Sequence, residues 1–177
     1  MVRKLAMPVF IMAGILFVLP WYTARYMGDK IAEIDGIKAL TGYRVTVPGF
    51  EGGAVLNPDV FIISIAGIIL LGILVFFVKG KLSAALSALL GFFGAGLLLF
   101  YMFDMDSYYT RLSQTVGGLI DISWQPGFWA VGGALLFAAL IGAIDLMIPD
   151  KKASRNKYMP PDAVYSEHDV SQVPPSL

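Results

Sequence analysis

Residues 60–78, VFIISIAGIILLGILVFFV, and residues 82–103, LSAALSALLGFFGAGLLLFYMF, decide the fold, because only the turn KGK separates these two long apolar runs. A helix needs about 20 apolar residues to cross a bilayer. Both runs reach that length without a single charge. Since the connection at 79–81 is too short for any other path, the stretch predicts two antiparallel membrane-spanning helices.

Two further apolar runs, residues 7–24 and 128–148, raise the expected number of crossings to four. The composition agrees, with 57% hydrophobic and 15% charged residues and a mean hydropathy of +0.72. The first run could be a cleavable signal peptide. Cleavage after Ala24 would place bulky Tyr22 where a small residue is needed, which favours a retained helix. We therefore expect an all-α membrane protein, a four-transmembrane-helix bundle.

Basic residues set the expected orientation in the cell (inner or plasma) membrane, because short cytoplasmic segments are enriched in lysine and arginine. Eight of the thirteen lie in residues 1–6, 79–81 and 149–177. The other five lie in the longer segments 25–59 and 104–127. Both termini are therefore expected in the cytoplasm, and the two long loops outside.

The two outer loops carry weaker signals for a small extracytoplasmic cap. In the first, isoleucines and leucine at helical spacing around residues 31–40 predict a short amphipathic helix, and GYRVTVPGF, 42–50, predicts a strand. The second contains a polar helical piece and IDISWQPGF, 120–128, with a strand over 119–124. We expect the two strands to pair in a β/helical cap. Their similar endings indicate either a repeat of the two halves or coincidence.

Aromatic residues gather at the expected outer boundary of the membrane, where tryptophan and tyrosine are enriched. A stacking site for a ligand is the alternative interpretation. The predicted interface belt consists of Trp21, Tyr22, Trp124 and Trp129, joined by Tyr101, Tyr108 and Tyr109.

Small residues recur every fourth position in the third and fourth apolar runs. This spacing lets two membrane helices approach closely, although alanine and glycine are also common in such helices for other reasons. The expected helix-packing residues are Ser83, Ser87, Gly91 and Ala95 on one run and Ala130, Ala134, Ala138 and Gly142 on the other.

Charged groups near the cytoplasmic face have two expected roles. Asp145 is the only ionisable residue inside an apolar run, and an ion pair with a nearby lysine is favoured over a proton relay. The tail, 149–177, has a composition typical of a disordered or partner-bound segment. Its basic residues are expected to bind anionic lipid headgroups or a partner, at ~1 kcal/mol each near the surface: Lys151, Lys152, Arg155 and Lys157.

Residues for catalysis or cofactor binding are scarce. The chain has no cysteine, and its one histidine, His168, lies in the tail, so no metal or cofactor is expected. Asp104, Asp106 and Asp121 could hold Ca²⁺ or form an acid/base pair, but no spacing matches a calcium loop. Balanced charge gives no reason to expect nucleic acid. We expect no enzyme.

The arrangement is similar in topology to the claudin-type four-helix membrane proteins, but their first-loop Gly-Leu-Trp motif and cysteine pair are absent, so the resemblance implies no function. The sequence favours a non-catalytic integral membrane subunit that scaffolds or stabilises a larger membrane assembly. Its partners are membrane lipids and other membrane subunits or copies of itself. The alternatives are a homo-oligomeric pore or facilitator and an extracytoplasmic binding or sensing module.

Overall fold

Three long apolar helices form the main part of the molecule. The computed structural model describes residues 5–45, 54–115 and 120–148. The chain divides into two compact units, Met1–Leu146 and Met147–Leu177, and the architecture that follows is that of the first. Three of its helical segments, Val60–Phe77, Lys81–Arg111 and Pro126–Met147, are long and apolar enough to cross a bilayer. These segments indicate a multi-pass membrane protein.

The first apolar run forms a shorter helix than the sequence predicts. Helix α1 (Ala6–Leu16) has 11 residues, and strand β1 (Pro20–Tyr26) follows after a brief turn. The expectation of one helix over 7–24 is therefore wrong from residue 17 onward. Pro20 explains the break, because its ring clashes with the carbonyl four residues earlier, that of Leu16, and disfavours helix at the residue before it.

Strand β1 turns tightly into strand β2 (Asp29–Asp35). Met27 and Gly28 both have positive φ angles, 53° and 89°, which a two-residue hairpin turn of the mirror-image type requires. The amphipathic helix expected over 31–40 is therefore wrong before residue 36, because pairing with β1 outweighs the local helical spacing. Helix α2 (Gly36–Thr41) starts where the Asp35 side chain accepts a hydrogen bond from the Lys38 N–H, 2.8 Å away.

The central strand of the sheet is β1, with β2 on one side and β5 (Ile120–Trp124) on the other, all antiparallel. The strand expected over 119–124 is present as β5, but its expected partner is wrong. Strand β3 (Tyr43–Val45) pairs instead with β4 (Ala54–Leu56). The longer β1 offers five successive partners, from Tyr22 opposite Trp124 to Tyr26 opposite Ile120, whereas β3 has three residues.

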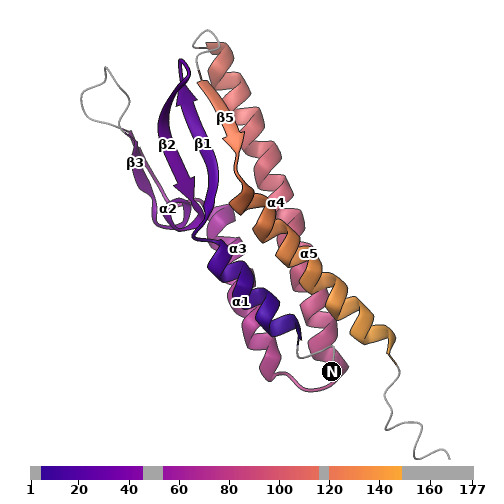
Figure 1. Ribbon diagram of the computed structural model, residues 1–177. Coiled ribbons are helices and arrows are strands. Elements are labelled where there is room, and N and C mark those ends of the chain that lie inside the picture. The colour runs from indigo at the N-terminus through magenta and orange to yellow at the C-terminus, as the bar shows by residue number, and fades with distance from the viewer. Residues whose placement is uncertain (1–4, 46–53, 116–119, 149–177) are drawn as a thin grey trace, which may run out of the picture. The chain divides into compact units, whose positions relative to one another are not determined.

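Helix α3 (Val60–Leu74) begins at the capping residue Asp59 and continues as the short 3₁₀ turn η2 (Val75–Phe77). Helix α4 (Lys81–Thr115) then runs without a break for 35 residues. The third apolar run was expected to end at 103, but the polar piece after it continues the same helix. At 1.5 Å per residue α4 is about 52 Å long, against a hydrocarbon layer of about 30 Å. Helix α4 is therefore longer than such a layer is thick, and β5 lies alongside its C-terminal part (Figure 1).

The helices pack through a shared apolar core. Helix α1 runs antiparallel to α3, since the Phe10 ring covers Gly72 and Gly14 lies beside Ile69. Helix α3 packs on α4, as the short turn predicts. Helix α5 (Pro126–Met147) contributes Phe128, Val131, Leu135 and Ala138, all fully or almost fully buried. This core holds the outer sheet and the spanning helices in one unit.

Candidate functional site

Helices α4 and α5 meet backbone to backbone at two glycines. A Cβ atom added to Gly91 would lie 2.6 Å from the Ala139 nitrogen and 2.6 Å from the Leu135 oxygen. One added to Gly142 would lie 2.5 Å from the Ala88 nitrogen. Of the other predicted packing residues, Ser83, Ser87, Ala95 and Ala138 are buried, and Ala130 and Ala134 are half-buried. The two small-residue stripes thus face each other within one protomer.

The aromatic residues assigned to an interface belt divide into two groups. Trp21 and Tyr22 are 0% and 2% exposed, so they lie in the protein core and do not contact a membrane interface. Trp124 is half-buried, and its Nε1 donates to Asp106 Oδ1 at 3.0 Å. Trp129, at 53% exposure, and Tyr108, at 60%, present their rings to the surroundings. Trp21 and Tyr22 are buried because strand β1 places them against helices α4 and α5.

Asp145 is half-buried near the end of α5. It makes no ion pair with any residue of the described ranges. The four basic residues expected to bind headgroups, Lys151, Lys152, Arg155 and Lys157, lie outside those ranges.

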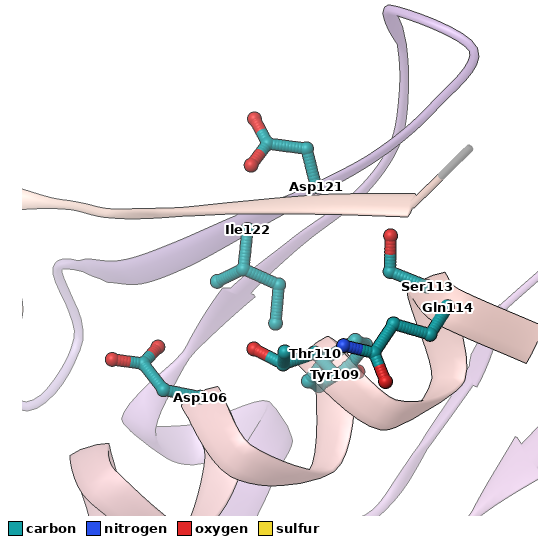
Figure 2. Close-up of a pocket in the computed structure, with 7 residues that line it drawn as sticks. All are labelled: Asp106, Tyr109, Thr110, Ser113, Gln114, Asp121 and Ile122. Atoms are coloured by element: carbon teal, nitrogen blue, oxygen red, sulfur yellow. The ribbon is translucent and has the colours of Figure 1, made fainter. Parts of the chain in front are cut away.

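A polar groove of about 450 Å³ lies between α4 and β5 (Figure 2). Helix α4 contributes Asp106, Thr110, Ser113 and Gln114, which the spacing of 3.6 residues per turn places on one face. Figure 2 shows Ile122 pointing from β5 toward the helix and Asp121 on the opposite side of the strand. The Asp106 and Asp121 carboxylates are thus not turned toward each other, which argues against an acid/base pair.

Metal binding finds no support in this groove. In the ranges that the structure describes, no three His, Cys, Asp or Glu residues are grouped closely enough to hold a metal ion. The groove instead offers hydroxyl, amide and carboxylate groups at its surface, which suit hydrogen bonding to a polar ligand.

A second, smaller pocket of about 140 Å³ lies where the tyrosines converge. The Tyr22 and Tyr43 hydroxyls are 3.3 Å apart. Asp59 and Asn57, at the entrance to α3, add a carboxylate and an amide. Five tyrosines line it, from β1, β3 and one face of α4: Tyr22, Tyr43, Tyr101, Tyr108 and Tyr109.

The sequence contained part of the signal for this tyrosine pocket. Tyr101, Met105, Tyr108 and Tyr109 follow a helical spacing that places them on one face, although the sequence predicts the polar helical piece after residue 104 as separate from the third apolar run. The sequence places Tyr22 with Tyr101 and these two tyrosines in the expected belt, whose alternative interpretation is a stacking site. It places Tyr43 only on a strand.

The tyrosine pocket leads to a prediction about how the tyrosine side chains ionise as the pH is raised. Burial raises the pKa of the Tyr43 phenol well above its usual 10.0, and burial followed by the neighbouring Tyr101 does the same for the pKa of Tyr22. A raised folded-state pKa contributes stability that is present below pH 10 and is lost as pH rises beyond it. We expect tyrosinate absorbance to rise in two phases, the later one accompanying loss of circular dichroism. A single phase near pH 10 with the fold intact would contradict this.

An apolar hollow of about 250 Å³ lies between α4 and α5. Gly132 and Gly133 form its floor, and an added Cβ at either would meet nothing within 4 Å. Leu99, Trp129 and Leu136, each 45–53% exposed, stand at its rim.

Comparison of the sequence with protein-family models and with curated proteins finds no match. The fold indicates a multi-pass membrane protein with three candidate spanning helices and a small antiparallel sheet.

Proposed function

We propose that this chain is a non-catalytic integral membrane subunit that scaffolds or stabilises a larger membrane protein assembly. The observation that carries the proposal is the closed seam between α4 and α5, where Gly91 and Gly142 contact the opposite backbone. The small residues of this seam are used for contacts within the protomer. The remaining helix surface consists mainly of large apolar side chains, among them Leu70, Phe92 and Phe137, each more than half exposed. Such a surface suits lipid and partner helices.

A fourth crossing completes the proposed topology. Phe10 lies at the level of Gly72 and Gly14 at that of Ile69, so α1 starts near the end of α3 and ascends beside it. The start of α1 then lies on the side of the turn at 79–80, which supports a cytoplasmic N-terminus once that turn is cytoplasmic. In this proposal α1 and the turn after it cross the membrane, both termini are cytoplasmic, and the sheet forms an outer cap.

The pore alternative is disfavoured by the same seam. A pore lined by oligomer contacts would need the small-residue stripes on the outside, and a polar path through the bundle. Among the described residues, the buried polar side chains are Thr23, Ser83 and Ser87, and the Ser83 hydroxyl donates to the Val75 carbonyl at 3.1 Å. Two separate serines and a threonine make no continuous polar path.

Gentle solubilisation of the native membrane tests the proposal. We expect the full chain to migrate on native gels as part of a complex with at least one other membrane protein, which mass spectrometry would identify. Recovery as a monomer under conditions that preserve known complexes would contradict it. Ion or solute flux through liposomes holding only the pure protein would favour the pore instead.

A further inference from the structure

The tyrosine pocket combines features that neither membrane docking nor the fold requires. It gathers five aromatic side chains around one carboxylate, that of Asp59, and among the residues that the structure describes no lysine, arginine or histidine lines it. Electron-rich tyrosine rings attract cations, by about 0.5–2 kcal/mol for each well-placed ring. A carboxylate adds a full negative charge to the same place.

We propose that this pocket binds an organic ammonium group, the positively charged head of an alkylated amine. Quaternary and primary ammonium groups are recognised by aromatic cages with an adjacent carboxylate because both elements neutralise the cation while its carbon atoms contact the rings. The site is independent of the proposed subunit role, since it would operate in a monomer as well as in an assembly.

The size of the pocket limits its ligand. Pockets for drug-sized molecules enclose roughly 300–1,000 Å³, whereas this one has about 140 Å³. It therefore has room for a single head group and not for a whole amphiphile. Any attached chain would have to extend out of the pocket, whose lining includes the exposed residues Asn57 and Tyr108.

The position of the pocket fits two sources of ammonium. Asp59 is the capping residue where the candidate span α3 begins, and Tyr101 stands on the opposite candidate span, α4. The pocket therefore lies at the level of lipid headgroups, where choline and ethanolamine heads are available. The same chemistry would also accept a free amine from the aqueous side.

The local electrostatics favour a cation. The partial positive charge at the start of α3, worth about half a unit, opposes one, but Asp59 Oδ1 already accepts the Phe61 N–H at 2.8 Å and its carboxylate carries a whole unit. A metal ion is a poorer occupant, because Ca²⁺ takes about six to eight oxygen ligands and the pocket has one carboxylate and one amide besides weakly coordinating phenols.

Binding is tested in two arms with purified full-length protein. In detergent, tetramethylammonium and choline chloride are titrated and the thermal unfolding temperature is compared with that in sodium chloride of equal ionic strength. In nanodiscs, native mass spectrometry measures retained phosphatidylcholine against phosphatidylglycerol. A rise with the soluble cations assigns a free amine as a ligand, and retention of phosphatidylcholine alone assigns a lipid head. No response in either arm would overturn the proposal.

Two variants separate binding from folding. Asp59→Asn preserves the helix cap, because asparagine caps as well as aspartate, but removes the charge, and we expect affinity for ammonium to fall about tenfold. Asp29→Asn removes an exposed carboxylate from the hairpin, outside the pocket, and should leave affinity unchanged. Equal effects of the two variants on ammonium binding would reject the site even if both proteins fold normally.

Discussion

Replacing Gly91 by alanine is expected to destabilise the protein by about 3 kcal/mol, the upper end of what overpacking usually costs. The reason is the identity of the atoms that the new methyl group would meet. They are the Ala139 nitrogen and the Leu135 oxygen, each 2.6 Å from the added Cβ. A flexible side chain can rotate away from such a contact, but the backbone of a helix cannot. Helices α4 and α5 would therefore have to separate along their length.

The matched control is Gly96→Ala in the same helix, five residues further on. An added Cβ there meets nothing within 4 Å. Since alanine is a better helix former than glycine by about 1 kcal/mol, this variant is expected to be neutral or slightly more stable. Unfolding of both proteins is followed by circular dichroism during SDS titration in mixed micelles. A Gly91→Ala protein as stable as the Gly96→Ala protein would disprove the close helix contact.

The same seam predicts how two changes combine. Gly142→Ala places its Cβ 2.5 Å from the Ala88 nitrogen, on the same pair of helices. Once α4 and α5 have moved apart to admit one methyl group, the second encounters less resistance. The double variant should therefore lose less stability than the sum of the two single losses, as expected for neighbouring sites.

The sequence predicted the parts of the fold that depend on local composition. The runs around α3, α4 and α5 are apolar over the length that a bilayer requires, and that property needs no knowledge of tertiary contacts. The strand β5 could also be predicted, because Ile120, Ile122 and Trp124 alternate with polar residues.

The errors came where a neighbour distant in sequence decides the structure. Residues 20–26 are apolar enough to extend a helix, but they become a strand because β2 and β5 pair with them on both sides. Pro20 is the one local signal in this segment that indicates the end of the helix. The sequence predicts a helical piece after residue 104 but not that it continues α4 to Thr115, because a change from apolar to polar residues ends an apolar run without ending a helix.

The tyrosine pocket could not be predicted from the sequence, because both of these errors concern elements that line it. Its walls include Tyr22 of β1, Tyr43 of β3 and one face of α4 that runs from Tyr101, inside the predicted span, to Tyr109 beyond it. A sequence reading that ends the helix at 103 and keeps Tyr22 in a membrane helix leaves these side chains on unrelated elements. Only the pairing of β1 with β5, which packs against α4, brings them together.

Replacing Trp21 by alanine is expected to have the largest effect of any single change in the cap, about 3–5 kcal/mol, as for other fully buried aromatic residues. Trp21 is 0% exposed. Its ring meets that of Phe17 edge-on at 4.7 Å and that of Phe128 at 5.9 Å. These contacts join the end of α1, the central strand and the start of α5, so their loss would detach the sheet from the helices.

A smaller change at the same position identifies the cause of that loss. The Nε1 of Trp21 is buried and has no hydrogen-bond partner in the part of the chain that the structure describes. Trp21→Phe removes this unsatisfied donor and keeps an aromatic ring, so we expect it to cost much less than Trp21→Ala, about 1–2 kcal/mol. Trp129→Ala, at a ring 53% exposed, should cost under about 1 kcal/mol. SDS titration measures all three. If Trp129→Ala destabilised the protein as much as Trp21→Ala, the anchoring role of Trp21 would be refuted, because that role rests on the burial of its ring between α1 and α5.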